Sequence, residues 1–366
     1  MSSTLFCRRP RWLAALAFAV CLPGTAVAAG PPVPIADFVR FANFSAPAMS
    51  PDGKYLVVAQ RTAKEPRDEY ATVVYELAGM KLVSAVRAGL VGDIPWRHTW
   101  VSDSRFVTSL AKEFGSVGQP WLTGELLASN ADGRGSAYLY GFRRMTSRTA
   151  GSFGTLTDDE GYGWVAQVPR SGEARVLVGE NPWAWDATSA RTSRLYDIDT
   201  VSTGRRTVTE INQPGFRFVI EAGGKPRFAY GYDDDAEYAV FKLDDDKREW
   251  RPFASAEKGD LRPISISLDN TRLLGSLSVQ RGPRSLVSEG VDGGDRRTLV
   301  GHPTGNIDRL EWGLRYQGPF AAGTSVGVPK LSYIVDPARS DAALHKTLSA
   351  QFPGQYVQFD SVSQRV

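Results

Sequence analysis

Short runs of apolar, β-branched and aromatic residues dominate the chain between residue 46 and about residue 335. Each run is bounded by Gly, Pro, Asp or Asn, which turns favour, so the pattern predicts short β-strands joined by turns. Helical periodicity is rare in the same region, which indicates an all-β protein. The clearest predicted strands are residues 56–59, 72–77, 106–110, 163–168, 217–221 and 273–277.

Neighbouring runs also pair as hairpins. Residues 195–199 and 207–209 flank the turn 202–206, in which we expect Gly204 to take a positive φ. Further along, three successive runs predict an antiparallel meander. These runs are residues 228–232, residues 238–243 and a run that begins at Trp250, separated by Asp233–Asp235 and Asp244–Asp246.

One turn pattern recurs, with a small polar residue, an Asp, a turn residue, a basic residue and then an apolar strand. It occurs around Asp52, Asp103 and Asp269, at separations of 51 and 166 residues. The Asp can bond its own backbone, and a following Gly or Asn can take positive φ. The longer separation is close to four units of about 40–45 residues, the period of propeller blades. Chance recurrence of a common turn is the alternative.

Many short strands with regular spacing favour a β-propeller over a sandwich, with about six to eight four-stranded blades. Two helical segments are expected outside the strands, a short turn at residues 34–41 and a helix at residues 340–352. Pro353 and Gly354 would end the second helix. Residues 355–362 then alternate like a strand.

Residues 1–28 have the features of a secretory signal peptide. Arg8, Arg9 and Arg11 precede a short apolar stretch, and the small residues before Ala28 predict cleavage after it. The apolar stretch is too short to span a bilayer. We therefore expect a periplasmic or secreted protein that is not inserted in a membrane after cleavage.

Removing the leader changes the charge and thiol content. Three of the 43 basic residues lie in it, which leaves 40 basic and 40 acidic residues. A formally neutral chain gives no electrostatic reason to bind nucleic acid. Cys7 and Cys21 also lie in the leader, so the remaining 338 residues have no disulfide, no cysteine metal ligand and no cysteine nucleophile.

Four stretches of the chain are informative in their order and spacing. They are residues 33–56, residues 100–103, residues 195–205 and residues 335–354. Together they resemble the N-terminal propeller portion of secreted bacterial serine peptidases of the prolyl oligopeptidase family, the dipeptidyl aminopeptidase and acylaminoacyl peptidase group. The resemblance covers residues 33–360.

The resemblance implies a propeller that caps an α/β-hydrolase domain and gates the access of short peptides to its Ser, Asp and His. That domain would need roughly another 200–250 residues, and we expect it to be absent here. We accordingly divide the chain into a signal peptide (1–28), a β-propeller (29–335) and a segment leading toward the missing hydrolase domain (336–366). The alternatives are a stand-alone periplasmic propeller that binds a protein or peptide partner, and a truncated remnant without function.

Gly323–Gly327 match the G-x-S-x-G pattern of a hydrolase nucleophile, with Ser325 at its centre. A nucleophile elbow needs a following helix, which Pro329 obstructs. The candidate partners Asp336, Asp341 and His345 are too close in sequence to lie on separate hydrolase loops. We therefore predict an ordinary loop between strands and assign no catalytic residue.

Metal and cofactor chemistry have little support. His98, His302 and His345 lack the spacing of zinc ligands. Asp233–Asp235 and Asp244–Asp246 lack the pattern of a calcium loop and are expected to be solvated turns. No metal or cofactor site is assigned. One or two tryptophans are expected to line a peptide tunnel while most pack between blades, and none is named as a ligand contact.

Overall fold

A computed structural model provides the structure of the chain. The chain divides into two compact units, residues 1–41 and residues 42–366. The predicted leader (1–28) and nearly all of the helical turn expected at 34–41 lie outside the described residues. Those residues are 34–35, 42–62, 69–87, 89–90, 92–113, 120–147, 159–170, 174–183, 192–233, 235–244, 246–254, 259–336 and 338–363.

Six antiparallel sheets follow one another in chain order within residues 42–366, and each is built from consecutive strands. Sheet 1 contains β1 (Phe44–Met49), β2 (Tyr55–Thr62), β3 (Glu69–Glu76) and β4 (Lys81–Arg87). Sheet 2 contains β5 (Asp93–Trp100), β6 (Arg105–Lys112), β7 (Trp121–Asn130) and β8 (Ala137–Tyr140), and the 3-10 helix η1 (Phe142–Ser147) follows it. Sheet 3 contains β9 (Gly161–Gln167), β10 (Arg175–Pro182), β11 (Ser193–Asp199) and β12 (Arg205–Ile211).

The second half of the unit continues the same plan. Sheet 4 contains β13 (Arg217–Ile220), β14 (Pro226–Tyr232), β15 (Tyr238–Asp244) and β16 (Glu249–Pro252). Sheet 5 contains β17 (Asp260–Ile266), β18 (Arg272–Ser278), β19 (Ser285–Gly290) and β20 (Arg297–Val300). Sheet 6 is described with three strands, β21 (Arg309–Glu311), β22 (Ala321–Thr324) and β23 (Lys330–Tyr333), and the helix α2 (Ser340–Gln351) follows it.

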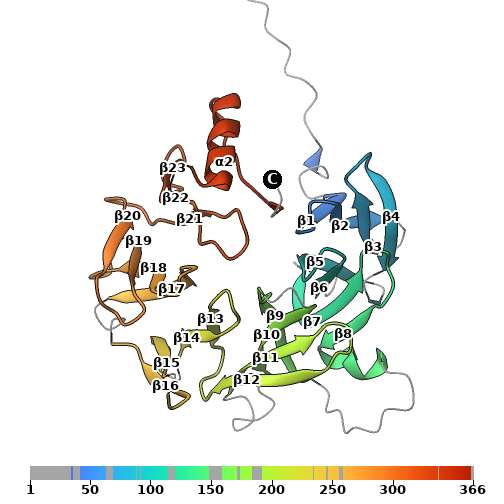
Figure 1. The fold of residues 1–366 in the computed structure, drawn as a ribbon, viewed down its shortest axis with the longest axis horizontal. Helices are drawn as coiled ribbons and strands as arrows, with labels where there is room; N and C mark the ends of the chain where they lie inside the picture. Colours follow the sequence, from blue (N-terminus) through green and yellow to red (C-terminus); the bar gives the residue numbers. More distant parts are fainter. Residues whose placement is uncertain are drawn as a thin grey trace, which may run out of the picture. The chain divides into compact units, whose positions relative to one another are not determined.

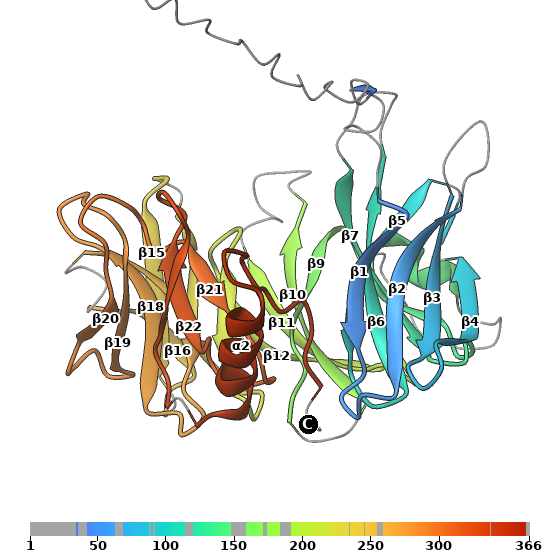
Figure 2. The same cartoon turned by 90° about the horizontal axis from the view of Figure 1, so that it is seen from above.

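The sheets are arranged around a common centre, with the first strand of each sheet on the inside (Figures 1 and 2). Apolar side chains fill the space between neighbouring sheets, as where Val107 and Leu126 of sheet 2 pack with Val176 and Val178 of sheet 3. Similar clusters join sheets 1 and 2, 3 and 4, 4 and 5, and 5 and 6. The predicted β-propeller is therefore confirmed, at the lower end of the expected six to eight blades.

The segment after α2 links the last sheet to the first. Phe359 packs on Phe320 in the turn before β22, with ring centroids 5.8 Å apart. Two residues further on, the Ser361 hydroxyl accepts a hydrogen bond from the Met49 N–H on β1 at 3.0 Å. In both views this segment runs between α2 and β1 (Figures 1 and 2). It forms no strand, so the strand predicted at residues 355–362 is wrong.

The recurring turn is confirmed in its first copy. The Asp52 carboxylate accepts hydrogen bonds from the Ser50 hydroxyl at 2.6 Å and from the Lys54 N–H at 3.0 Å. Gly53 sits between them at φ +72°, a conformation that suits glycine because it has no Cβ.

The turn at Asp269 repeats this geometry, with its carboxylate accepting from the Thr271 N–H at 3.1 Å and Asn270 at φ +59°. The turn at Asp103 differs. There the Ser102 hydroxyl accepts the Ser104 N–H at 3.4 Å. A serine hydroxyl can replace an Asp carboxylate in such turns because both accept a backbone N–H two residues on.

Two further local predictions have different outcomes. The helix expected at 340–352 is confirmed as α2. In the β11–β12 turn, Thr203 takes the positive φ (+61°), so the assignment of that conformation to Gly204 is wrong. The Asp199 carboxylate accepts the N–H groups of Val201 and Ser202. These bonds fix the turn so that the positive φ falls at residue 203, one residue before the expected position. In the described part of the chain, no helix has the length and apolar character needed to cross a membrane.

Candidate functional site

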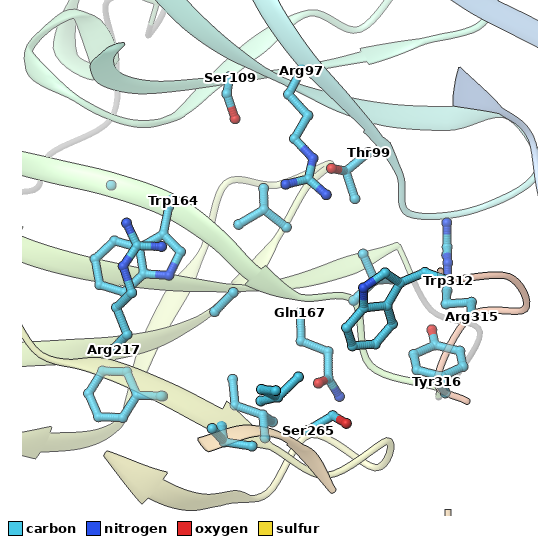
Figure 3. A pocket seen from close by; sticks show the side chains of 18 of the residues that line it. Arg97, Thr99, Ser109, Trp164, Gln167, Arg217, Ser265, Trp312, Arg315 and Tyr316 are labelled. Atoms are coloured by element: carbon cyan, nitrogen blue, oxygen red, sulfur yellow. The ribbon is translucent and has the colours of Figure 1, made fainter. Parts of the chain in front are cut away.

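A cavity of about 630 Å³ lies at the centre of the ring (Figure 3). Its walls are the first strands of four sheets, β5, β9, β13 and β17, with parts of β6 and β7. Residues 312–318, between β21 and β22, complete it and are called the crossing loop below. The volume is in the range of about 300–1,000 Å³ that is typical of small-ligand sites.

Bulges on the inner strands direct side chains toward this cavity. Between Pro95 and Arg97 the pairing of β5 with β6 shifts register, so Trp96 is an extra residue. A similar shift lies between Pro263 and Ser265 on β17. A bulge bends its strand and re-aims the neighbouring side chains. Trp96 and Arg97 are consequently both exposed along the cavity wall.

Three arginines reach the cavity from different sides (Figure 3). Arg97 comes from β5, Arg217 from the start of β13, and Arg315 from the crossing loop. Among the described residues, none of the three has an ion-pair partner. The Arg217 guanidinium lies 5.3 Å from the centre of the Trp164 ring, a cation–π contact that fixes its position.

Neighbouring residues fix the orientation of the Trp164 ring on β9. Tyr162 stacks on it with ring centroids 6.2 Å apart and an angle of 25° between the planes. Directly opposite on β10 is Gly179, where an added Cβ would lie 2.2 Å from a carbon of the indole. The glycine is thus required for the indole to lie across the strand.

Glu125 is the one acidic residue in the described lining of the cavity, and Arg143 already neutralises it. Glu125 is 1% exposed and forms an ion pair with Arg143, which also pairs with Asp93. Burial lowers the pKa of Arg143, but hydrogen bonds and the charges of the two carboxylates outweigh it and raise the pKa above the usual value. No carboxylate in the described lining is therefore available to Arg97, Arg217 or Arg315.

The crossing loop joins opposite sides of the ring. The Tyr316 hydroxyl donates to the Pro169 carbonyl, next to sheet 3, at 3.2 Å. At its base the Leu314 N–H donates to the Asp341 carboxylate at 3.0 Å, and Arg339 pairs with the same carboxylate. A second cavity of about 370 Å³ shares the loop's residues and is otherwise lined by inter-strand turns. The loop therefore separates two cavities.

Ser325 is the centre of the G-x-S-x-G match. It lies in the exposed turn between β22 and β23, with a strand rather than a helix after it. Its hydroxyl donates to Asp308 at 3.0 Å and accepts from Arg309 at 2.9 Å. The nucleophile of a Ser-His-Asp triad has a histidine as its base, and among the described residues no histidine bonds this hydroxyl. This arrangement agrees with the loop that the sequence predicts.

The residues considered as partners of Ser325 serve α2 and its surroundings. His345 is buried, with one ring nitrogen bonded to the Tyr333 hydroxyl at 2.8 Å and the other to the Val357 carbonyl at 2.9 Å. Asp341 binds Arg339, and the Asp336 carboxylate accepts the Ala338 N–H. Among the described residues, no hydrogen bond joins Ser325 to any of them.

The remaining histidines also have structural roles. His98 is buried on β5, where its ring bonds to the Thr108 hydroxyl at 3.0 Å. Burial lowers the pKa of His98 to about 3, so the ring is neutral at pH 7. The His302 ring accepts the Gly305 N–H at 3.0 Å and so fixes a turn.

The acidic triplets form turns where they are described. Asp233 accepts the N–H groups of Asp235 and Glu237, and Asp244 accepts those of Asp246 and Lys247. Within the described ranges, no three His, Cys, Asp or Glu side chains lie close enough together to hold a metal ion.

Three tryptophans, Trp96, Trp164 and Trp312, line the cavity, one more than the one or two expected. Trp100 and Trp250 pack between sheets, as expected for most of them. None of the three cavity arginines is predicted as a site residue from the sequence. Arg97 and Arg217 could be noticed there, because each is a charged residue within a run that is typical of a strand.

Comparisons with known proteins give only structural neighbours. No protein-family model and no curated protein matches the chain. Similar solved structures include a Pyrococcus horikoshii acylaminoacyl peptidase, at 9% identity and a TM-score of 0.49, over 80% of this chain and 45% of that chain. A prolyl endopeptidase is 14% identical with a TM-score of 0.47, over 80% of this chain and 42% of that chain.

An oligogalacturonate lyase in complex with manganese is 14% identical with a TM-score of 0.45, over 81% of this chain and 79% of that chain. Two of these three neighbours are peptidases. This chain spans less than half the length of those two peptidases.

Proposed function

We propose that residues 42–363 are the substrate-gating propeller of an exported prolyl oligopeptidase-like serine peptidase. The central cavity carries this proposal. It is built from the inner strands and combines three tryptophans with a few polar groups, including Thr99 and Gln167. Polar and apolar groups both line the cavity, and sites for organic ligands likewise combine apolar surface with placed polar groups. Its volume suits a short peptide and excludes a folded protein.

The crossing loop supplies the gate. It lies between the two cavities on the axis of the ring and is held to sheet 3 through the Tyr316 hydroxyl. One neutral hydrogen bond contributes about 1 kcal/mol, so this contact can open without disturbing the sheets. Tyr316 also has a φ of +67°, a strained conformation for a residue with a side chain. A peptide passing along the axis would have to displace this loop.

Peptide cleavage is assigned to a separate α/β-hydrolase domain. Among the described residues, one serine hydroxyl meets a histidine ring, that of Ser349, at 3.4 Å from a His345 nitrogen that Tyr333 already holds at 2.8 Å. Ser325 is held by Asp308 and Arg309. Export is part of the same proposal and depends on residues 1–28 acting as a cleaved signal peptide in a bacterium.

A second candidate is a stand-alone periplasmic propeller that binds a peptide or protein partner. The crossing loop favours it, because a loop that stays bonded to sheet 3 makes the central cavity a blind site. The two candidates share the peptide site and differ in whether the loop opens.

The test is peptide retention by the exported chain. The protein is purified from the periplasm of an expressing bacterium, and its intact mass should correspond to a chain that starts at Ala29. It is then incubated with a library of short peptides, and bound peptides are identified by mass spectrometry. Ser265→Trp fills the cavity from β17, and Ser202→Trp places the same side chain on an exposed turn outside it.

We expect the wild type and Ser202→Trp to retain peptides and Ser265→Trp to lose them. Circular dichroism of all three proteins establishes that each is folded. If the folded wild type retains no peptide, or if Ser265→Trp retains the same peptides, the central cavity is not a peptide site and the proposal is wrong.

A further inference from the structure

We propose that the central cavity selects acidic peptides, with Arg97, Arg217 and Arg315 binding their carboxylates. This inference rests on the proposed peptide-binding function and specifies its substrate class. The ligand would carry at least two carboxylates, from Asp or Glu side chains or a free C-terminus. Apolar side chains between them would lie against the tryptophans.

Unpaired arginines in the cavity contrast with the arginines elsewhere. Most arginines of the described sheets are held by carboxylates, as Arg143 is by Asp93 and Glu125. Other arginines in ion pairs are Arg87, Arg175, Arg194, Arg205, Arg206, Arg251, Arg262, Arg272, Arg284, Arg296, Arg297 and Arg339. A single unpaired arginine on a surface has little meaning, but three that line one cavity leave a local excess of positive charge.

The surroundings of the three arginines strengthen their attraction for anions. The one acidic lining residue, Glu125, is engaged with Arg143. Asp93 also pairs with Arg143. The two carboxylates are outnumbered by Arg143 and the three cavity arginines taken together, so positive charge remains in excess. Charges that face a partly enclosed cavity act through less water than charges on an open surface, so their interactions are stronger.

The guanidinium group binds carboxylates and phosphates alike, and the peptide site proposed above makes the carboxylate the anion that we commit to. The planar guanidinium fork donates two parallel hydrogen bonds to one carboxylate. The three forks come from β5, β13 and the crossing loop and lie around the cavity rather than beside one another (Figure 3). A ligand that reaches more than one of them must therefore carry separated carboxylates.

The aromatic residues indicate what lies between the carboxylates. Trp96 and Trp312 remain 45% and 42% exposed at the cavity. Together with Trp164 they offer flat apolar surfaces on which aliphatic or aromatic side chains pack. The hydroxyls of Thr99, Ser109 and Ser265 line the cavity and can bind peptide N–H and C=O groups (Figure 3). The Gln167 amide nitrogen donates to the Glu221 carbonyl, which leaves the amide oxygen for a ligand.

The test uses the exported full chain and a pair of synthetic peptides of equal length, both amidated at the C-terminus so that only side chains supply carboxylates. One has Glu at two positions that flank a Phe, and the other has Gln at both. Dissociation constants are measured by calorimetry at low and at moderate salt. We expect the Glu peptide to bind about tenfold more tightly or better, because hydrogen bonds between charged groups are stronger than neutral ones. Salt should weaken the Glu peptide more than the Gln peptide.

Variants assign the effect to the three side chains. Arg97→Gln, Arg217→Gln and Arg315→Gln should each weaken the Glu peptide about fivefold or more while changing the Gln peptide little. Arg134→Gln is the control, since Arg134 is exposed on the β7–β8 turn of the same sheet as Arg97 and does not line the cavity. It should change neither constant.

The outcomes separate this inference from the proposed function. Equal affinities for both peptides, blocked by Ser265→Trp, would overturn the acidic preference and leave the peptide site standing. Binding of neither peptide by folded protein would contradict both proposals. Tighter binding of an acidic oligosaccharide than of the Glu peptide would overturn the peptide assignment and keep the arginines as an anion site.

Discussion

The hydroxyl of Tyr316 and the carbonyl oxygen of Pro169 are 3.2 Å apart, although 147 residues separate them in the chain. The tyrosine belongs to the loop between β21 and β22, and the proline follows β9. Sheets 6 and 3 lie on opposite sides of the ring (Figure 1). This bond therefore fastens the crossing loop across the axis.

Tyr316→Phe should loosen that loop without unfolding the ring. Losing one neutral hydrogen bond costs about 1 kcal/mol, which is about a fivefold rise in the open population of the loop. Hydrogen exchange of the loop amides, followed by mass spectrometry, should become faster, while exchange in the sheets stays the same. Tyr232→Phe, an exposed tyrosine on β14, should change neither.

The same variant distinguishes a gate from a blind site. If the loop gates the cavity, peptide association and dissociation should both become faster in Tyr316→Phe, with little change in affinity. Stopped-flow fluorescence of the cavity tryptophans measures these rates. Faster loop exchange with unchanged peptide rates would contradict gating and favour the stand-alone binding module.

Gly179→Ala should destabilise the protein and displace Trp164. The new Cβ would lie 2.2 Å from the indole, and relieving such overlap in a packed site costs about 1–3 kcal/mol. Urea unfolding should show the lower stability, and the tryptophan emission should shift as the indole moves. Gly223→Ala is the control, because a Cβ there meets nothing within 4 Å. Equal stability of the two variants would contradict the packing role of Gly179.

Arg143→Met should destabilise the protein strongly, since it leaves the Asp93 and Glu125 carboxylates buried without their cation. Removing one partner from a buried ion pair costs about 3–5 kcal/mol. Arg251→Met breaks exposed ion pairs with Asp244 and Glu249 and should cost about 1 kcal/mol or less. Urea unfolding at pH 7 compares the two variants.

Equal losses of stability in the two variants would contradict a buried ion pair at Arg143, since they would mean that Asp93 and Glu125 are solvated once the arginine is gone.

Local patterns predicted much of this fold from the sequence. The β14–β15–β16 meander and the turn at Asp52 depend on residues close together in the chain, so alternation and turn chemistry were sufficient. The segment at 355–362 also alternates, yet its side chains bind α2, sheet 6 and β1 one by one, and no neighbouring strand pairs with it. Alternation of apolar and polar residues indicates that a segment has one buried side and one exposed side. It does not indicate whether another strand pairs with that segment.

The arginine cluster could not be predicted in the same way. Arg97, Arg217 and Arg315 are more than 90 residues apart in the chain, and they meet only because the first strand of each sheet faces the centre. Their lack of carboxylate partners is a property of the packed ring. If the first strand of each blade is taken to line the centre of the ring, Arg97 and Arg217 can be identified as cavity residues from the sequence. The position of Arg315 depends instead on the length and path of the crossing loop.

His98 should make stability sensitive to acid. Its pKa is about 3 in the folded protein because of burial, whereas a histidine in an unfolded chain has a pKa of about 6.5. Between these values the unfolded chain binds more protons, so stability is complete above about pH 6.5 and falls as the pH decreases, by up to about 1.4 kcal/mol per pH unit.

Urea unfolding at pH 7, 6 and 5 tests this for the wild type and for His98→Gln, which cannot be protonated in this range. The loss of stability per pH unit should be smaller in the variant, whatever its stability at pH 7. Identical slopes would mean that His98 is accessible to water and titrates normally.

The last prediction concerns chemistry at Ser325. A fluorophosphonate reacts with a serine whose hydroxyl is activated by a neighbouring base. Here the hydroxyl donates to Asp308 and accepts from Arg309, and the buried His345 is engaged by Tyr333 and Val357. Intact mass spectrometry of the exported protein treated with the probe should therefore show no adduct. Labelling that disappears in Ser325→Ala would make this chain a hydrolase in its own right and would remove the need for a separate catalytic domain.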